Sequence, residues 1–303
     1  MFDPQPADAM ETNDELPLDL ASLEQRKLEE IEHSRLRRTI LQGSERRSDT
    51  NHAEQAAGLE RLIRDKDAFD YHFSNVKWYS ITEASERFQY GWLREKCGPG
   101  TRVLDFACGN GENGVFAASC GADVTGIDIS PEGVANANQN AKEAGVAEHC
   151  RFQVMDGENL SFPDNTFDFG VEYGALHHVD LDRSLAELKR VLKPGGEMIC
   201  VEAMRHNPFI HAYRRRTPQL RTRWEVEHIL GVESLDIVRR HFTEVDVRFF
   251  HLAALAAVPF RKTPLFRPLR AVLDIVDRVL LSNQTIGKYG WIMVFVMRAP
   301  KGK

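Results

Sequence analysis

A glycine-rich segment between residues 103 and 114 is the first part of the chain that could do chemistry. It reads V-L-D-F-A-C-G-N-G-E-N-G, and Gly109, Gly111 and Gly114 follow the pattern G-x-G-x-x-G. The apolar run before the glycines predicts a strand, and the segment after them predicts a helix. Glycine in such a turn permits a positive φ and lets a ligand approach the backbone. Taken alone, the pattern indicates either a dinucleotide site or an ordinary tight turn.

An acid within the predicted strand changes the ligand that we expect at this turn. Asp105 precedes Gly109, and there it would face the pyrophosphate of a dinucleotide, whose charge has the same sign. A cationic ligand would be favoured instead. S-adenosylmethionine carries an ammonium and a sulfonium group and has no phosphate, so it is the cofactor that we predict.

The next predicted strand also ends in an acid. Asp128 lies in the segment V-T-G-I-D-I-S, and an acid at this place in a doubly wound fold accepts hydrogen bonds from ribose hydroxyls. The alternative role is a helix N-cap, but Ser130, which directly precedes Pro131, fits that role better. We therefore predict that Asp128 binds the ribose.

A third acid, Asp156, ends the strand predicted over residues 151–155. Its carboxylate and the backbone amide of Gly157 are suited to bind an adenine edge. A polar loop without a ligand remains the alternative at this position.

Five segments in this order resemble the class I S-adenosylmethionine-dependent methyltransferases, and among them the small-molecule "type 11" domain. They are LDFACGNG, GIDIS, MDGENLSFPDNTFD, ALHHV and LKPGG. The resemblance implies an α/β, doubly wound Rossmann-like fold with a seven-stranded sheet whose last strand is antiparallel. It also implies the cofactor-binding residues, which are Asp105, Ala107, Gly109, Gly111, Asp128, Ile129, Asp156, Gly157, Glu158 and Glu172. Ala107 stands where the family usually has glycine, and alanine is tolerated at this place if its φ is negative.

The acceptor side is expected beyond the fourth strand, in the segment E-Y-G-A-L-H-H-V. Ligands of doubly wound folds bind at the carboxyl ends of the strands, so Tyr173, His177 and His178 are the candidate catalytic residues. Methyl transfer depends mostly on placement. A histidine base is useful only where the acceptor must lose a proton, and packing or capping roles are the alternative for both histidines.

Two stretches of the chain are basic and contain no acid. The first, residues 203–224, carries Arg214, Arg215 and Arg216, which we predict to bind substrate. The second, residues 247–273, adds further cations and an apolar helix face. We expect either an acceptor cap for an anionic molecule, a peripheral contact with a membrane, or a solvated basic face.

Composition limits the class of protein. The 39 Lys+Arg and 45 Asp+Glu leave a net charge of −6, which argues against a nucleic-acid partner. No apolar run is long enough to span a membrane, and the N-terminus does not resemble a secretory signal. The five cysteines form no C-x-x-C pair, so we predict no metal site and a reducing, cytoplasmic setting.

The chain is expected to have three parts. Residues 1–55 are predicted as a disordered or helical extension and residues 56–100 as a helical lid segment. Residues 101–303 are predicted as a class I methyltransferase domain with cap insertions near 204–230 and 251–289. The lid assignment depends on a cluster of aromatic residues, which are Phe69, Tyr71, Phe73, Trp78 and Tyr79. We expect removal of residues 1–55 to leave cofactor binding intact.

The predicted function is S-adenosylmethionine-dependent methyl transfer to a small or lipid-like acceptor, which could be anionic. Two alternatives remain open at this point. One is a degenerate methyltransferase that acts as a nucleoside-binding partner or a membrane-surface scaffold. The other is an NAD-linked oxidoreductase, which the G-x-G-x-x-G pattern permits but Asp105 disfavours.

Overall fold

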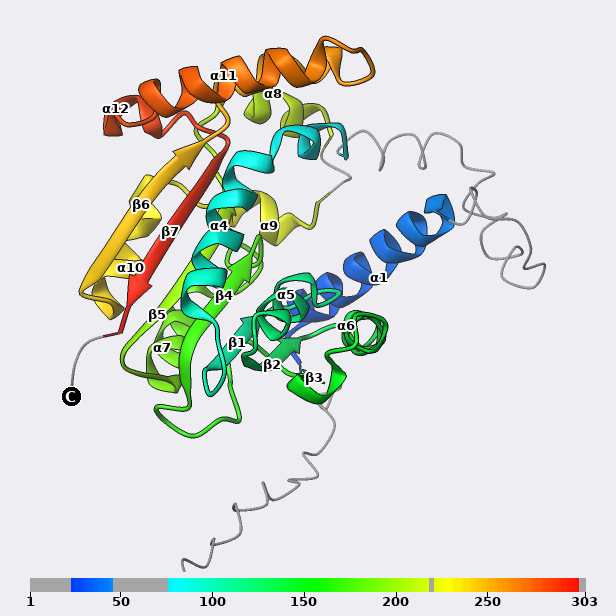
Figure 1. Cartoon of the computed structure of the whole chain (residues 1–303), viewed down its shortest axis with the longest axis vertical. Helices are drawn as coiled ribbons and strands as arrows, with labels where there is room; N and C mark the ends of the chain where they lie inside the picture. The colour runs from blue at the N-terminus through cyan, green and yellow to red at the C-terminus, as the bar shows by residue number, and fades with distance from the viewer. Residues whose placement is uncertain (1–22, 46–75, 218–220, 300–303) are drawn as a thin grey trace, which may run out of the picture.

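A seven-stranded sheet with the strand order β3-β2-β1-β4-β5-β7-β6 forms the centre of the molecule (Figure 1). The computed structural model describes residues 23–45, 76–217 and 221–299. The strands are β1 (Arg102–Phe106), β2 (Asp123–Asp128), β3 (Cys150–Val154), β4 (Phe167–Tyr173), β5 (Leu192–Ala203), β6 (Glu244–Phe250) and β7 (Ile292–Arg298).

The direction of the strands follows the expected pattern. β1 pairs in parallel with both β2 and β4, whereas β7 runs antiparallel to β5 and to β6. The predicted antiparallel last strand is therefore confirmed. The connections change direction across the sheet between β1 and β4, and ligands of such folds bind at the carboxyl ends of the strands beside this point.

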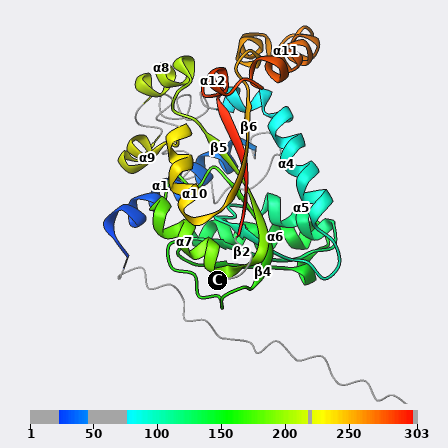
Figure 2. The ribbon, with the colours of Figure 1, turned by 90° about the vertical axis from the view of Figure 1, so that its left-hand side faces the viewer.

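Helices cover both faces of the sheet (Figure 2). Their bounds are α1 (Gln25–Glu45), η2 (Val76–Ile81), α4 (Glu83–Lys96), α5 (Glu112–Ser119), α6 (Pro131–Glu143), η3 (Ala147–His149), α7 (Leu181–Val191), α8 (Pro208–Arg216), α9 (Arg223–His228), η5 (Val232–Ser234), α10 (Leu235–His241), η6 (Ala254–Phe260), α11 (Phe266–Leu280) and α12 (Gln284–Gly287). Helices α4, α5 and α6 pack on one face, and α7 and α10 pack on the other.

Helix α7 shows how local sequence produces these layers. The Asp180 side chain caps its first turn by accepting a hydrogen bond from the Arg183 amide. Leu185, Leu188 and Val191 recur at helical spacing, and each is fully buried against the sheet. Ser130 caps α6 in the same way, as its sequence predicts.

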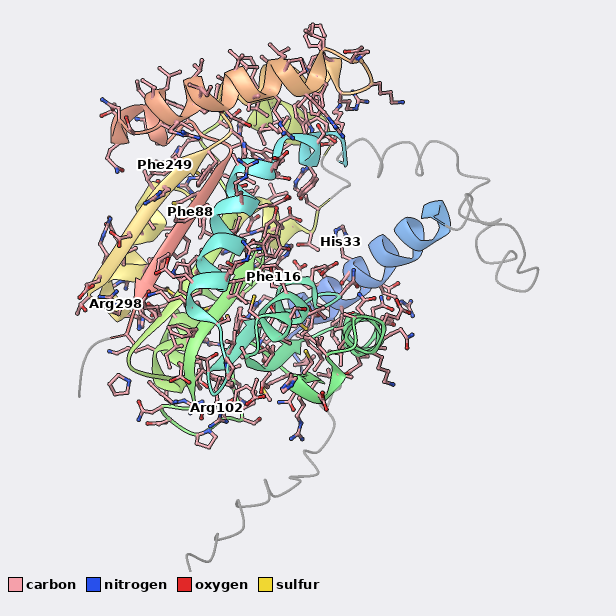
Figure 3. The ribbon with its side chains drawn as sticks, in the orientation of Figure 1. His33, Phe88, Arg102, Phe116, Phe249 and Arg298 are labelled. Atoms are coloured by element: carbon pink, nitrogen blue, oxygen red, sulfur yellow. The ribbon has the colours of Figure 1, made fainter. Side chains whose placement is uncertain are left out.

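The edge strand β6 contributes to both layers because its successive side chains alternate between faces. Phe250 lies 6.0 Å from the Phe88 ring of α4, measured between ring centroids. Phe249 joins the core on the opposite face, with α7 and α10. Figure 3 shows Phe88 on α4 and Phe249 at the upper end of β6.

Part of the predicted N-terminal organisation lies outside the described residues. This applies to residues 1–22 and 46–75, which include Phe69, Tyr71 and Phe73. Trp78 and Tyr79 are described; they make edge contacts with Tyr213 and Trp291, at 5.3 and 5.7 Å between ring centroids. The division at residues 55 and 100 therefore stays a prediction.

The two predicted insertions form helices. Residues 204–230 contain α8 and α9, and residues 251–289 contain η6, α11 and α12. Among the described helices, none is both long enough and apolar enough to cross a membrane.

Two glycine substitutions test the packing at the sheet and on α4. Gly126→Ala would place a methyl group inside the Phe152 ring, so we expect the free energy of unfolding to fall by about 1–3 kcal/mol. Gly91→Ala meets no atom within 4 Å in the middle of α4 and should raise that free energy by about 0.5–1 kcal/mol. Urea unfolding measures both, and equal effects of the two substitutions would contradict the packing described here.

Candidate active site

A cavity of about 440 Å³ lies at the carboxyl ends of β1, β2 and β4. Nine of the predicted site residues line it, and they are Ala107, Gly109, Asp128, Ile129, Asp156, Gly157, Glu158, Tyr173 and His178. Asp105, Gly111, Glu172, His177 and Arg214–Arg216 do not line it. The sheet thus brings together residues from the ends of four strands, β1, β2, β3 and β4, that are far apart in the chain.

The turn after β1 depends on left-handed backbone conformations. Gly109 and Gly111 have φ of 58° and 82°, and Ala107 has φ of 52°. The negative φ that would make alanine tolerable at this place is therefore not present. A left-handed conformation costs an L-residue roughly 1–2 kcal/mol, which explains why glycine is the better residue at this place in the turn.

Asp105 lies beneath the turn and not in the cavity. Its side chain is 1% exposed, and it accepts a hydrogen bond of 2.9 Å from the Gly114 amide. A side chain at Gly114 would meet the Asp105 carboxylate and the Phe152 ring, so glycine permits this approach. Burial raises the pKa of Asp105 to about 8. In this structure Asp105 holds the start of α5 in place.

Asp128 connects the ends of β1 and β2. One carboxylate oxygen accepts a hydrogen bond from the Gly109 amide at 2.8 Å, and the other accepts one from the Ser130 amide at 2.8 Å. The Asp128 side chain also lines the cavity. Because a carboxylate has about four acceptor sites, the two backbone bonds fix its orientation and still leave capacity for ligand hydroxyl groups.

Asp156 and Glu158 extend the acidic wall of the cavity, and both are paired with cations of α1. The Lys27 ammonium lies 2.6 Å from Asp156 and 3.0 Å from Glu158. One Arg26 nitrogen bonds both Glu158 oxygens, at 2.7 and 2.6 Å. Burial acts to raise the pKa of Glu158, but the bonds from Arg26, the Asp180 amide and Lys27 together outweigh it, so the pKa is lowered.

Helix α1 continues from this wall to the acceptor side. Its Glu30 lies 2.9 Å from Nδ1 of His178 and also accepts a hydrogen bond from the Thr222 hydroxyl. The Arg26 guanidinium lies 4.4 Å above the Trp224 ring of α9. Helix α1 therefore bridges the predicted adenine end of the cavity and the cap formed by α9.

This contribution of α1 was missed at the level of sequence. The apolar positions of residues 21–42 indicate only a thin amphipathic helix. The useful signal is a set of charges, Arg26, Lys27 and Glu30, on one helix face. These charges are complementary to the Asp156, Glu158 and His178 side chains that they meet.

His177 and His178 have different surroundings, although they are adjacent in the chain. His177 is 8% exposed and its Nδ1 lies 2.6 Å from the buried Glu202. His178 lines the cavity. Burial acts to lower the pKa of His178, but the hydrogen bond to Glu30 and the charges of Glu30, Glu225 and Glu202 together outweigh it, so the pKa is raised. Of the two histidines, His178 is therefore the one placed to meet an acceptor.

Glu172 is fully buried beside Glu202, and its place does not match direct cofactor binding. It accepts a hydrogen bond from the Ala175 amide at the start of the loop after β4. Burial and the neighbouring Glu202 charge raise the pKa of Glu172 well above its usual value. Tyr173 lines the cavity, and burial raises the pKa of its hydroxyl. Glu172 thus shapes the loop that carries the histidines.

One group of side chains is suited in number and type to hold a metal ion. A ring nitrogen of His177, a ring nitrogen of His178 and a carboxylate oxygen of Glu225 lie within 4.8 Å of one another. However, Nε of Arg221 lies 3.3 Å from Glu225, and its guanidinium already supplies a positive charge. We therefore describe these side chains as an ion-pair network.

The arginines of the two acid-free stretches do not form one basic patch. Several of them pair with acids that lie outside these stretches: Arg221 with Glu225 and Arg223 with Glu227 at i,i+4, and Arg205 with Glu233 and Arg270 with Glu83 at longer separation. Arg248 lies over the Phe88 ring, at 4.5 Å from its centroid. These pairings argue against an acceptor cap that is built from all the cations of the two stretches.

The three predicted substrate-binding arginines lie in different surroundings, although they are consecutive in the chain. Arg214 donates a hydrogen bond of 2.7 Å to the Met204 carbonyl, and burial lowers its pKa to about 10. Arg215 and Arg216 are exposed at the end of α8. A role for these three residues in substrate binding stays a prediction.

Comparison with known proteins identifies a family. Residues 104–200 match the methyltransferase domain family. The chain is 29% identical to the sterol 4-C-methyltransferase of Caenorhabditis elegans over 172 residues, which is 52% of each chain. It is 39% identical to the demethylmenaquinone methyltransferase of Symbiobacterium thermophilum over 132 residues, which is 42% of this chain and 49% of that protein. The chain thus spans about half the length of these relatives.

Solved structures share the fold at low sequence identity. The [4+2]-cyclase SpnF has a TM-score of 0.50 and 22% identity, with 73% of this chain and 82% of that chain covered. Phosphoethanolamine N-methyltransferase 2 of Haemonchus contortus has a TM-score of 0.51 and 18% identity, with 71% and 52% covered. The match of residues 104–200 shows that this part of the chain is a methyltransferase domain, and the solved structures show that the chain shares their fold.

Proposed function

We propose that this protein transfers a methyl group from S-adenosylmethionine to a small, lipid-like acceptor. One observation carries the proposal: the Asp128 carboxylate is held by two backbone amides at the wall of a cavity of about 440 Å³. This orientation suits the two hydroxyls of a ribose. Asp156 and Gly157 at the end of β3 are then placed for the adenine, and the turn at Gly109 for the methionine end.

The side chains around the turn fit this cofactor better than a dinucleotide. Glu112 lines the cavity at the start of α5, where the pyrophosphate of a dinucleotide would need to approach a helix N-terminus. A carboxylate there repels a phosphate and attracts an ammonium group. S-adenosylmethionine supplies, when bound, a methyl group that its sulfonium already activates.

The task of this chain is then to place the acceptor and exclude water. Tyr173, Ala175 and Val179 give an apolar wall to the cavity near His178. Helix α1 closes another side through Arg26 and Lys27. Among the described residues, α1 covers the cavity in the way that was predicted for a lid at residues 56–100.

The acceptor class is supported by the relatives and by the charges of the site. The names of two relatives specify a sterol and a demethylmenaquinone as what those proteins act on. In this chain, Arg214 and Arg221 are engaged by Met204 and Glu225. These pairings support an uncharged acceptor more than the anionic one that the sequence suggested.

A scaffold without methyl transfer remains the alternative outcome of the tests. The same fold occurs in a [4+2]-cyclase, so the fold alone does not establish the reaction. No feature of the described residues favours this alternative, because the turn, Asp128 and the cavity are all present.

Substitution of Asp128 tests the proposed ribose contact. Hydrogen bonds to a charged group contribute about 1.5–3 kcal/mol, so Asp128→Ala should weaken binding of S-adenosylhomocysteine by about tenfold to over a hundredfold. Calorimetry measures the affinity, and Asp128→Asn preserves the side-chain size if the alanine variant unfolds.

Asp123→Ala is the matched control, because Asp123 is an exposed acid at the opposite end of β2. Its affinity should equal that of the wild type. An unchanged affinity in a folded Asp128 variant, or tight binding of NAD by the wild type, would overturn the proposal.

Loss of the α1 cations should weaken cofactor binding. Arg26→Ala with Lys27→Ala removes the charges that pair with Asp156 and Glu158. We expect the affinity for S-adenosylhomocysteine to fall about tenfold, roughly 1.4 kcal/mol. This expectation replaces the one drawn from the sequence, in which residues 1–55 are dispensable.

Arg35→Ala is the control for that double variant, since the Arg35 guanidinium pairs with Glu32 on the same helix. Calorimetry should show no change for it. If the double variant binds as tightly as the wild type, or more tightly, α1 does not close the site.

The pH dependence of turnover tests whether His178 accepts a proton. A base must be neutral, so activity should rise with pH as His178 loses its proton. Glu30 raises the pKa of His178, with Glu225 and Glu202 acting in the same direction. Glu30→Gln should therefore move the rise to lower pH.

Profiles of kcat/KM for the wild type, Glu30→Gln and the exposed control Glu29→Gln make the comparison. His178→Ala should lower turnover while leaving cofactor affinity nearly unchanged. Normal turnover in His178→Ala, or an unshifted profile in Glu30→Gln, would show that His178 only packs against α1.

A further inference from the structure

Helix α11 presents an apolar face to the solvent. It crosses the top of the molecule in Figure 1, and its outward side chains are aliphatic at helical spacing. Their exposed fractions are 53% for Leu265, 58% for Val272, 59% for Ile275, 37% for Val276, 69% for Val279 and 37% for Leu280. Single exposed apolar residues are common, but a contiguous apolar helix face usually marks an interaction surface.

The inward side of the same helix carries its two acids, Asp274 and Asp277, together with Arg270. The Asp277 carboxylate accepts hydrogen bonds from three consecutive amides, of Leu252, Ala253 and Ala254, at 3.1, 2.6 and 3.0 Å. Arg270 pairs with Glu83 of α4. An amphipathic helix on a globular protein normally buries its apolar stripe, whereas polar side chains hold α11 with much of its apolar surface facing outward.

Several apolar side chains also anchor the helix and fix its rotation. Phe266, Leu269 and Leu273 pack partly buried against the core beneath α11. The polar contacts of Asp277 and Arg270 and these apolar contacts together hold the aliphatic face outward.

The charge around this face has one sign. Arg261 and Lys262 are exposed on the turn between η6 and α11, and Arg267 and Arg278 are exposed on α11. The acids of residues 251–281 are Asp274 and Asp277, and both are drawn inward, toward Arg270 and the amides before η6 respectively. An exposed aliphatic face beside exposed arginines and without exposed acids is complementary to an anionic lipid surface.

The neighbouring helices extend the apolar surface. Phe209 of α8 is 67% exposed, and Ile286 and Tyr289 near α12 are 36% and 41% exposed. Figures 1 and 2 both show α8, α11 and α12 at the same end of the molecule.

We propose that α11 docks this protein on the surface of an anionic lipid bilayer. The helix lies in the plane of the membrane with Val272, Ile275 and Val279 among the acyl chains and Arg267 and Arg278 at the phosphates. η6 and α11 follow the carboxyl end of β6, which lies at the same edge of the sheet as the carboxyl ends of β1, β2 and β4 beside the cavity. If the proposed function holds, a lipid-like acceptor would reach the cavity from the same edge.

Vesicle co-sedimentation with the whole chain tests the docking. The wild type should bind vesicles of phosphatidylcholine and phosphatidylglycerol, and it should bind pure phosphatidylcholine more weakly. Val272→Asp with Val279→Asp should weaken binding about tenfold or more, while Arg267→Gln with Arg278→Gln should reduce only the preference for the anionic vesicles.

Ala144→Asp with Ala147→Asp is the matched control, since it adds the same charge at exposed positions near β3. It should bind vesicles nearly as the wild type does. Absence of vesicle binding by the wild type, or equal binding by the Val272 and Val279 variant, would overturn the proposal. So would a wild-type dimer in sedimentation that this variant converts to a monomer, because the face would then belong to a second copy of the chain.

The affinity for S-adenosylhomocysteine, measured by calorimetry on the same variants, separates this inference from the proposed function. It should stay unchanged in every vesicle-binding variant, since α11 contributes no residue to the cavity. A variant that loses vesicle binding but keeps normal cofactor affinity bears on the docking through α11 and leaves the proposed function unaffected.

Discussion

The hydrogen bond from the Gly109 amide to Asp128 is the contact on which the site depends. It joins the turn after β1 to the end of β2, which are neighbouring parallel strands of the sheet. A second amide, of Ser130, fixes the same carboxylate at the start of α6. With Asp128 held in this way, the carboxyl ends of neighbouring strands form one wall, and Asp156 and Glu158 extend it.

This wall creates an electrostatic problem that α1 resolves. Several carboxylates gathered in one cavity repel each other and lose hydration. Arg26 and Lys27 neutralise Asp156 and Glu158, and Glu30 on the same helix meets His178 on the acceptor side. One helix thus balances the charge of the predicted adenine end, covers the cavity and sets the protonation of the candidate base.

The strands and the cofactor turn could be predicted from sequence because their signals are local. Apolar runs that end in glycine or an acid mark strand ends, and parallel strands bring those ends to one edge of the sheet.

The conformation of Ala107 was not predictable in this way, because the turn imposes a positive φ on a residue that rarely adopts it. The role of α1 was also hidden, since Arg26 and Glu158 are 132 residues apart in the chain. The basic stretches suggested an anion-binding surface because the acids that neutralise Arg205 and Arg270 come from other segments of the chain.

The central claim is that the cavity at β1, β2 and β4 holds S-adenosylmethionine. Native mass spectrometry of the purified chain, before and after addition of S-adenosylmethionine, tests it most directly. The account predicts one bound molecule with the mass of S-adenosylmethionine or of S-adenosylhomocysteine. A bound mass of NAD, or no bound nucleoside after S-adenosylmethionine is added to the folded protein, would contradict it.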